Sequence, residues 1–399
     1  MTAPLDGIRV IDWTHVLAGP ACSYYLGLLG AEVIKVESLK GDAMRHRGGT
    51  DAALAAEGMS TAYQTQGAGK QSIALDLEVN EGRDVFHRLL TSADVLVENH
   101  RPSTLARLDL TEAHTRAINP RLIHCAMTGY GRGNAMADVP AYDVNIQAIS
   151  GLMALTGTAE TGPVRTGAPI IDYATGLAGA LGVTSALMNR QATGDGGFVD
   201  VSMLETAFSL MSSTITDYRM TGRPPEPRGN TANSRSPSSG IFACLSGHIS
   251  LGVNEDSQFR RLANAVGRGD WLDNPDFANP VARDRNRDTL ADALADVLAH
   301  RTAEDWERIF IAADVPAARL RTLPEALDLA PETTRAFVSR GTAGHVGLPF
   351  TMEDRATTKQ ADRPPSLGGD TEPVLRALGY NDDEVSALRQ QGVIASRLN

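Results

Sequence analysis

The sequence predicts an α/β fold in which a large domain with a parallel sheet is followed by a second, smaller α/β domain. Near the N-terminus, the β-rich run Ile8–Trp13 is followed by a helical stretch and by a second β-rich run, Glu32–Glu37. A strand, a helix and a strand in this order form a right-handed βαβ unit. Of the 399 residues, 42% are hydrophobic and 21% are charged. The chain can therefore bury a sizeable core and is long enough for more than one domain.

The elements of the large domain follow from local periodicity. The first helix is expected to open at Gly19-Pro20 and to end at Gly30, because Cys22, Leu26 and Leu29 are spaced for one buried face. Further strands are expected at Ser72–Leu77, Val95–Glu98 and Leu122–Met127, with a helix at Glu81–Leu90 between the first two. In an open parallel sheet, ligands bind beyond the carboxyl ends of the strands.

Residues 151–220 differ in composition, because they are rich in glycine and alanine. A helix is expected through Leu177–Met188, with many small residues that let another backbone or a ligand approach closely. A second long helix is expected from Met203 to about Arg219. The following segment, Gly222–Gly240, is rich in proline, glycine, serine and asparagine, so it is expected to be a linker or an active-site loop.

These changes divide the chain into three segments. Residues 1–221 are expected to form the first part of the large domain, and residues 222–327 the linker and the small α/β domain. Residues 328–399 are expected to return to the large domain. The elements expected beyond residue 240 are the strand Ser250–Val253 and the helices Leu290–Leu298, Asp305–Ala312 and Asp382–Gln391.

Charge and cysteine content exclude several classes of protein. Lys and Arg total 37 against 48 Asp and Glu, a net charge of −11, so the electrostatic footprint of a nucleic-acid-binding protein is absent. Cys22, Cys125 and Cys244 are far apart, which excludes a disulfide framework and fits a reducing compartment. No signal peptide is recognisable, and no apolar run reaches the roughly 18 residues needed to span a bilayer. We expect a cytoplasmic protein that binds neither nucleic acid nor a membrane.

Common catalytic and cofactor motifs are incomplete. The first βα turn reads Leu17-Ala18-Gly19-Pro20-Ala21 in place of G-x-G-x-x-G, although Glu37 is placed like a ribose-binding acid. Gly69-Lys70-Gln71 lacks the hydroxyl residue and the upstream glycine of a phosphate loop. No pair among the nine histidines has metal-ligand spacing, and no G-x-S-x-G elbow is present. We expect no metal site and no tightly bound cofactor.

The segment Gly167–Gly176 contains the most informative carboxylate. Asp172 follows an apolar run and stands at the start of the helix of small residues. Aspartate is a preferred N-cap residue, so a purely structural role is one interpretation. A carboxylate at a helix N-terminus is also expected to stay ionised, and an ionised carboxylate can attack an acyl group. The two roles are compatible.

Seven segments, taken in order, resemble the class III (CaiB/BaiF, formyl-CoA transferase-like) coenzyme A transferases. They are LDGIRVIDWTHVLAGPACSYYLGLLGAEVIKVE, KQSIALDL, DVLVENHRP, TGYGRG, PAYDVNIQAISGLMALTG, IIDYATGLAGALGVTSAL and TGDGGFVDVSMLE. The ending DDEVSALRQQGVI also matches, so the resemblance runs from about residue 5 to the last expected helix. Seven such strings in sequence form a specific signal.

The resemblance implies a Rossmann-like large domain, a smaller α/β domain and an interlocked homodimer in which two chains thread through each other. It implies that Asp172, in a D-x-x-T-G segment, is the catalytic nucleophile, and that a coenzyme A thioester is the substrate. The CoA-binding residues that it implies are His15, Leu17, Ala18, Leu75, Asn99, His100, Arg101, Arg107, Tyr142 and Asp143. Arg101 and Arg107 suit the nucleotide phosphates; without the resemblance, a role as solvated surface charges is as reasonable.

Two departures from the family pattern concern the acyl groups. Leu17 stands where the formyl- and oxalyl-type enzymes have a glutamine beside the thioester, and their glycine-only loop is absent. The nearest segment, Gly229–Ser236, contains Arg235, whose guanidinium can bind a second carboxylate by a two-point contact. We therefore expect a small dicarboxylate on at least one side of the exchange. The alternative is that Arg235 points to solvent.

The sequence thus predicts a CoA-transferase that moves CoA between an acyl-CoA, such as succinyl-CoA, and a free dicarboxylic acid through an aspartyl-CoA thioester. The first alternative is an α-methylacyl-CoA racemase on the same fold, which needs an acid/base pair. The histidine of that pair lies in a G-H-D segment, where this chain has Ala141-Tyr142-Asp143. Tyrosine, with a pKa of about 10, is a poor base at neutral pH. The second alternative, a non-catalytic acyl-CoA-binding homologue, leaves Asp172 unexplained.

Overall fold

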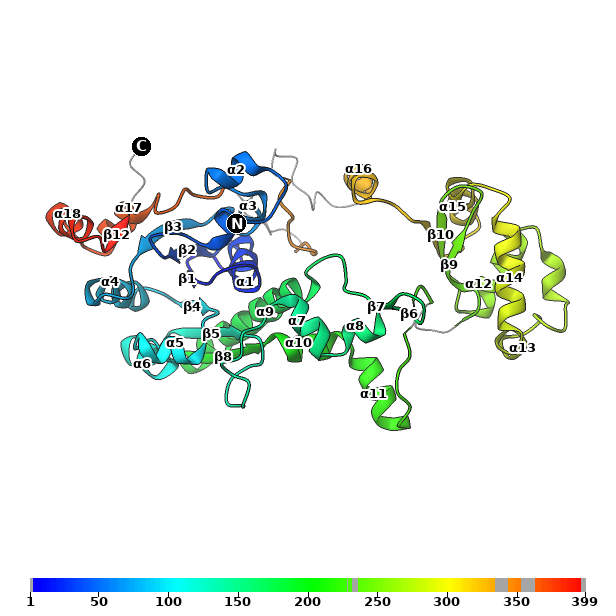
Figure 1. Ribbon diagram of the computed structural model, residues 1–399, viewed down its shortest axis with the longest axis horizontal. Coiled ribbons are helices and arrows are strands. Elements are labelled where there is room, and N and C mark those ends of the chain that lie inside the picture. Colours follow the sequence, from blue (N-terminus) through cyan, green and yellow to red (C-terminus); the bar gives the residue numbers. More distant parts are fainter. Residues whose placement is uncertain (1–2, 228, 232–235, 334–343, 353–362, 396–399) are drawn as a thin grey trace. The chain divides into compact units, whose positions relative to one another are not determined.

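The computed structural model describes residues 3–227, 229–231, 236–333, 344–352 and 363–395 (Figure 1). The chain divides into two compact units. Unit 1 consists of Met1–Met153, Arg165–Pro224 and Thr334–Asn399, and unit 2 of Ala154–Val164 and Pro225–Thr333. Each unit has a hydrophobic core of its own.

Unit 1 is built on a seven-stranded sheet with the order β12-β3-β2-β1-β4-β5-β8. The strands are β1 (Arg9–Trp13), β2 (Glu32–Glu37), β3 (Gln71–Leu75), β4 (Val95–Glu98), β5 (Ile123–Thr128), β8 (Gly197–Ser202) and β12 (Ile394–Ala395). Every neighbouring pair is parallel except β12 and β3, which confirms the predicted α/β class. The strand order reverses between β1 and β4, and such a reversal leaves a crevice at the carboxyl ends of the strands.

Helices cover both faces of this sheet (Figure 1). One face packs against α1 (Ala18–Leu28) and α9 (Ile170–Thr193), which share a core with the strands. The other face packs against α4 (Asn80–Thr91), α17 (Thr371–Ala377) and α18 (Asp382–Gln390). The other helical segments before residue 222 are η1 (Ala43–Arg45), α2 (Ala52–Ala56), α3 (Thr61–Gly67), α5 (Pro102–Arg107), α6 (Glu112–Ile118), α7 (Asp143–Ile149), α8 (Leu152–Leu155), α10 (Met203–Leu210) and α11 (Ser212–Thr221).

The 24-residue helix α9 packs closely on α1 because small residues line the contact. A Cβ atom at Gly176 would lie 2.9 Å from the Ala21 Cβ, and one at Gly179 would lie 2.9 Å from the Cys22 Sγ. Contrary to the sequence expectation, α9 is long and apolar enough to cross a membrane by length and composition, with a mean hydropathy of 1.3. Of the apolar window, 39% is buried inside the protein, so the buried face of α9 serves the core of unit 1.

Unit 2 contains a three-stranded antiparallel sheet with the order β11-β10-β9. Only part of β10 was predicted. The strands are β9 (Ser239–Ala243), β10 (His248–Gly252) and β11 (Ala317–Arg319), and the helical segments are α12 (Asp256–Ala265), η2 (Gly269–Leu272), α13 (Pro280–Arg285), α14 (Arg287–Leu298), α15 (Ala303–Ala312) and α16 (Leu323–Thr333). Trp271, Leu294 and Phe310 belong to its core.

A short hairpin of β6 (Gly157–Thr158) and β7 (Gly162–Pro163) also belongs to unit 2. The sequence analysis placed these residues within the 1–221 segment of the large domain. The difference has a local cause, because the Gly229 N–H donates to the Gly157 carbonyl oxygen at 2.7 Å. The hairpin is thereby joined to residues that are distant in the sequence.

Three further elements differ from the sequence predictions. The helix expected from Met203 to Arg219 is divided into α10 and α11 at Met211, where φ is −107° and ψ is 17°. Strand β8, which follows α9, was not predicted. Neither was β12, in which Ile394 pairs with Leu75 of β3. Both strands depend on tertiary pairing, with β5 and β3 respectively, that local periodicity does not reveal.

Candidate active site

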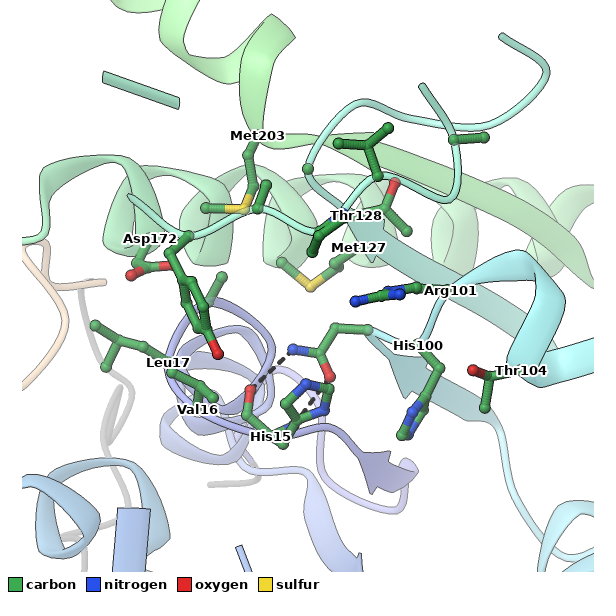
Figure 2. Close-up of a pocket in the computed structure, with 18 residues that line it drawn as sticks. His15, Val16, Leu17, His100, Arg101, Thr104, Met127, Thr128, Asp172 and Met203 are labelled. Atoms are coloured by element: carbon green, nitrogen blue, oxygen red, sulfur yellow. Dashed lines mark hydrogen bonds between the residues drawn. The ribbon is translucent and has the colours of Figure 1, made fainter. Parts of the chain in front are cut away.

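A cavity opens at the carboxyl ends of β1, β4 and β5, where the strand order reverses (Figure 2). Its wall consists of the segments that follow these strands, together with the first turns of α9 and α10. The lining residues are His15, Val16, Leu17, Ala18, Asn99, His100, Arg101, Thr104, Met127, Thr128, Gly129, Ala137, Val139, Pro140, Ala141, Tyr142, Asp172 and Met203. This is the place in the fold where the topology predicts a ligand.

Most of the predicted site residues meet in this cavity, although they come from four separate parts of the sequence. Those that line it are His15, Leu17, Ala18, Asn99, His100, Arg101, Tyr142 and Asp172. Sequence reasoning missed Met127, Thr128 and Met203. The signal for Met127 and Thr128 was available, because they end the strand expected at Leu122–Met127, whereas Met203 follows a strand that was not predicted.

Asp172 lies in the first turn of α9, two residues after the helix begins at Ile170. It does not cap the helix, since the N-cap residue is Pro169. Among the described residues, no hydrogen-bond donor or cation contacts its carboxylate. Burial and the nearby charge of Asp143 raise the pKa of Asp172 from 3.8 to about 7. The expectation that the helix N-terminus keeps this group fully ionised is therefore wrong, because desolvation favours the neutral acid.

The capping role considered for Asp172 belongs to Asp143. One Asp143 oxygen accepts the N–H of Ile171 at 2.8 Å and that of Asp172 at 3.3 Å. The other oxygen accepts the Gln147 side-chain amide at 2.6 Å. Asp143 is 5% exposed and does not line the cavity, so its geometry fits a residue that fixes the start of α9 rather than one that binds CoA.

Asn99 clamps two loops of the cavity wall together. Its side-chain oxygen accepts the His15 N–H at 2.9 Å, and its side-chain nitrogen donates to the His15 carbonyl oxygen at 2.8 Å. Figure 2 shows these two bonds as dashed lines. The geometry therefore gives Asn99 the role of holding the loop, and because Asn99 also lines the cavity, its predicted contact with CoA stays a prediction.

Two neighbouring histidines form an uncharged part of the wall. The rings of His15 and His100 are 5.3 Å apart, and His100 packs on Trp13 with ring centroids 4.0 Å apart. Burial lowers the pKa of His15, and burial together with His15 lowers the pKa of His100 to about 3. Both rings are therefore neutral at pH 7, and they offer an aromatic surface rather than a site for phosphate.

The predicted phosphate ligands differ in position. Arg101 is exposed and reaches the cavity; in the view of Figure 2 it lies on the side opposite Asp172. Arg107 does not reach the cavity, because its guanidinium is paired with Glu78 on the surface. Leu75, which is 2% exposed, packs in the core beneath the sheet. The geometry therefore supports contact with a ligand in this cavity for Arg101 but not for Leu75 or Arg107.

Several backbone N–H groups at the start of α1 have no hydrogen-bond acceptor within the described residues. Its N-cap residue, Leu17, makes no side-chain cap hydrogen bond, and the first turn contains no acidic residue. Within the described part of the chain, the N–H groups of Leu17, Ala18 and Gly19 have no acceptor. Leu17 and Ala18 line the cavity together with Asp172. Backbone N–H groups in such a place can bind an oxyanion that forms during acyl transfer.

A buried network of charges lies behind the loop of residues 14–18, and the sequence analysis did not identify it. Its ion pairs are Lys35–Asp42 at 3.2 Å, Arg45–Glu37 at 2.6 Å and Lys70–Asp12 at 2.8 Å. All six side chains are at most 3% exposed, and their charges balance. The signal was present in the sequence, because Asp12, Lys35 and Glu37 interrupt otherwise apolar strands.

One predicted site residue cannot be placed. Arg235, the expected substrate ligand, lies outside the described residues, so its role stays a prediction. Among the residues that are described, no group of three or more His, Cys, Asp and Glu side chains is arranged to hold a metal ion.

Comparisons with known proteins agree with this geometry. Residues 5–371 match the model of CoA-transferase family III. The chain is 35% identical to a succinate–glutarate CoA-transferase of Agrobacterium fabrum over 283 residues, 70% of each chain. It is 33% identical to the succinyl-CoA–L-malate CoA-transferase beta subunit of Chloroflexus aurantiacus over 412 aligned positions, 98% of each chain.

A solved structure shares the fold over nearly the whole chain. The crystal structure of a CAIB/BAIF family protein from Brucella suis superimposes with a TM-score of 0.84 at 29% identity, covering 95% of this chain and 100% of that one. Family model, relatives and fold thus point to the same group of enzymes, all of which use CoA thioesters as substrates. The chain belongs to the class III CoA-transferases, the CaiB/BaiF family, and it is a CoA-transferase.

Proposed function

We propose that this enzyme takes CoA from succinyl-CoA, or a similar acyl-CoA, and passes it to a free dicarboxylic acid through a thioester on Asp172. The observation that carries the proposal is the carboxylate of Asp172, which faces the cavity without a hydrogen-bond donor or cation among the described residues. Its raised pKa, about 7, makes the ionised form a stronger nucleophile while leaving a large fraction ionised near neutral pH.

The proposed reaction proceeds through two successive attacks. An Asp172 oxygen attacks the donor acyl carbon, the carbon–sulfur bond breaks, and CoA leaves as the thiolate, which gives a mixed anhydride. The thiolate then attacks the side-chain carbonyl of Asp172 and releases the donor acid, which leaves an aspartyl-CoA thioester. The acceptor carboxylate reverses these steps and regenerates Asp172, so the thioester is exchanged and no water is consumed.

Each attack forms an oxyanion beside Asp172, and the open start of α1 offers donors for it. The N–H groups of Leu17 and Ala18 are free within the described residues, and both residues line the cavity. Preorganised donors of this kind are typically worth about 100- to 1,000-fold in rate. The apolar side chains of Leu17, Met127 and Met203 line the same cavity and oppose the entry of water, which would hydrolyse the anhydride.

The names of the relatives support the choice of acids. Besides the two enzymes above, a succinyl-CoA–D-citramalate CoA-transferase of Chloroflexus aurantiacus is 35% identical over 326 residues. Succinate, glutarate, malate and citramalate all carry two carboxylates. A second carboxylate needs its own cation, and we propose Arg235 for this role, since a guanidinium binds a carboxylate by two parallel hydrogen bonds.

An oxygen-labelling experiment tests the nucleophile. With an acceptor whose carboxylates carry ¹⁸O, the proposed anhydride returns one labelled oxygen to Asp172 in each turnover. Mass spectrometry of the peptide that contains Asp172 should then show incorporation that depends on both substrates. Direct attack of the acceptor on the donor would leave this peptide unlabelled and would refute the covalent route.

Substitution of the nucleophile should have the largest effect on turnover of any change in the cavity. Asp172→Ala should lower turnover by about 10⁴-fold or more, because covalent catalysis is removed entirely. Asp138→Ala is the control, since Asp138 does not line the cavity and its carboxylate instead accepts the backbone N–H and the hydroxyl of Ser103. An Asp172→Ala enzyme that keeps more than a tenth of wild-type turnover contradicts the assignment.

The acid specificity is tested by comparing succinate or malate with butyrate as acceptor. If Arg235 binds the second carboxylate, Arg235→Ala should reduce the preference for the dicarboxylate by about tenfold or more. Arg223→Ala is the matched control, because Arg223 is an exposed guanidinium in the same proline-rich segment. A better rate with butyrate, or an unchanged preference in Arg235→Ala, rules out this account of specificity. Deuterium uptake at the α-carbon in the same assays would instead favour the racemase alternative.

We also propose that the enzyme is a homodimer, as the resemblance implies. Large apolar side chains are exposed along three consecutive helices of unit 1. They are Leu177, Leu181, Met188, Phe208, Leu210, Ile215, Tyr218 and Met220. Exposed large apolar side chains that gather on neighbouring elements are typical of an interface. Leu181→Glu should therefore reduce the mass measured by analytical ultracentrifugation, whereas Ile311→Glu, at a similarly exposed site in unit 2, should not.

A further inference from the structure

Val16, in the loop between β1 and α1, has an unusual backbone conformation. Its φ is 69°, in the left-handed region. The other non-glycine residues with positive φ in the described part of the chain are Asp109 and Asp314, and aspartate tolerates this region far better than a β-branched residue does. Such strain persists only where the surroundings enforce it, and it concentrates at functional sites.

The carboxylate of Asp42 holds Val16 from behind the loop. Its two oxygens lie 3.4 and 3.3 Å from the Val16 nitrogen and accept its N–H. Asp42 is itself fixed, because it accepts the Met44 N–H at 2.9 Å and its own N–H donates to Glu37 at 3.0 Å. Asp42 is 7% exposed and does not line the cavity.

Lys35 fixes both Asp42 and the start of the loop. Its Nζ lies 3.2 Å from an Asp42 oxygen and donates to the Thr14 carbonyl oxygen at 2.9 Å. The side chains of Lys35 and Asp42 are 2% and 3% exposed. Within a buried ion pair, the loss of one partner leaves an uncompensated charge, so each partner keeps the other in place.

The conformation of Val16 decides where the next residues lie. The chain turns there, so that Leu17 becomes the N-cap residue of α1 and Leu17 and Ala18 line the cavity with Asp172. The first turn of α1 cannot shift toward Thr14, because the backbone at Gly19 already lies close to the Thr14 side chain. A Cβ atom built at Gly19 would be only 2.6 Å from the Thr14 Cβ. The ion pair and this close contact thus fix the loop from two sides.

We propose that Asp42, supported by Lys35, is a positioning residue for CoA transfer: it holds Val16 in the left-handed region and thereby directs the Leu17 and Ala18 N–H groups at the carbonyl oxygen of the acyl group attacked by Asp172. The inference rests on the proposed function, because the Leu17 and Ala18 N–H groups can stabilise an oxyanion only if Asp172 attacks an acyl group in this cavity. It extends that function to a residue that touches neither the substrate nor the nucleophile.

The test is Asp42→Asn in the full-length enzyme, with succinyl-CoA as donor. The asparagine amide keeps one acceptor oxygen, but it has no negative charge. The substitution therefore weakens the hydrogen bond to the Val16 N–H and removes the ion pair with Lys35. The single-turnover rate of aspartyl-CoA thioester formation should fall about 10- to 100-fold, on the scale of losing an oxyanion donor. The dissociation constant of the donor should change less than about threefold, because Asp42 itself does not line the cavity.

A second substitution distinguishes positioning from a merely structural role. Glycine adopts positive φ without strain, so adding Val16→Gly to Asp42→Asn should restore at least about tenfold of the lost rate. A loss caused only by weakened folding would instead follow the stability of the variants, so thermal unfolding of the wild type and both variants is measured beside the rates. Asp94→Asn is the control at the amino end of β4, the end opposite the cavity: it breaks the pair with Arg190 at 2.9 Å and should lower thermal stability while thioester formation stays within about threefold.

Crystal structures of the variants give a readout that does not depend on activity. In Asp42→Asn, residue 16 should leave the left-handed region, and in the double variant it should return. Retention of the wild-type φ at residue 16, an unchanged rate in Asp42→Asn, or failure of Val16→Gly to rescue would each overturn the inference. Failure of the proposed function itself would appear differently, as a wild-type enzyme without ¹⁸O label on Asp172.

Discussion

The helices α1 and α9 both begin at the cavity, but they begin in opposite ways. The first turn of α9 is capped by a side chain from another element, since Asp143 accepts the N–H groups of Ile171 and Asp172. The first turn of α1 has no side-chain cap, and it is preceded by a strained Val16. The start of α9 is thus closed, in the sense that a carboxylate accepts its N–H groups. The start of α1 is open, because its first N–H groups have no acceptor among the described residues and its first residues line the cavity.

The difference separates two tasks that one helix start cannot perform well. A nucleophilic carboxylate needs a high pKa, and the capped turn of α9 supplies it, because burial and Asp143 raise the pKa of Asp172 to about 7. An oxyanion site needs donors without competing acceptors, and the start of α1 leaves them free. If Asp172 had occupied the open helix start, the same N–H groups would have lowered its pKa and weakened its attack.

Among the changes that test this comparison of the two helix starts, closing the open start of α1 should give the largest effect. In Gly19→Ala, the new methyl group would meet the Thr14 side chain at 2.6 Å, which should push the first turn of α1 away and lower turnover about 100-fold. Overpacking should also cost about 1–3 kcal/mol of stability. Steady-state assays and thermal unfolding measure both effects. Gly27→Ala, in the last turn of the same helix, is the control, and equal activity of the two variants would contradict the role given to the open start.

Removing the cap from α9 should have an intermediate effect. Asp143→Ala leaves the N–H groups of Ile171 and Asp172 and the Gln147 amide without their acceptor, so stability should fall by about 0.5–2 kcal/mol. The pKa of Asp172 should also fall, because a neighbouring negative charge is gone. The acid limb of the kcat/KM profile should therefore move to lower pH, while the maximal rate falls by about tenfold as the nucleophile becomes weaker. An acid limb that stays in place would mean that Asp143 does not influence Asp172.

The smallest effect concerns stability without any substrate. The pKa of Asp172 is raised on folding from 3.8 to about 7, so the native state binds a proton more tightly than the unfolded chain. Stability is then lost as pH rises between these values. Asp172→Asn should consequently be more stable than the wild type at pH 8, by about 1–2 kcal/mol after allowance for solvent. The difference should shrink toward pH 4, and urea titrations at both pH values measure it. A difference that does not vary with pH would show that the pKa is not raised.

The two helix starts also show how far the sequence could predict the site. The sequence placed Asp172 near the start of a helix and put it in the segment that resembles the family's nucleophile. It could not show that Asp143, 29 positions earlier, caps that helix, because a cap from another element leaves no local pattern. Asp143 and Asn99 were expected to bind CoA, and the structure gives both side chains protein partners. Motifs shared with a family thus predict which residues lie near a site, but they do not predict which of these residues contact the ligand.

The sequence by itself determined the α/β class, the strands that flank the cavity and the family, because hydrophobic periodicity and ordered motifs are local properties of the chain. Only the tertiary structure decided the raised pKa of Asp172, the strain at Val16 and the balance of the buried charges around Lys35 and Asp42. These properties depend on desolvation and on distances between groups that lie on different strands and loops. Burial and electrostatic interaction are set by what surrounds a side chain in space, and that is fixed only when the sheet has formed.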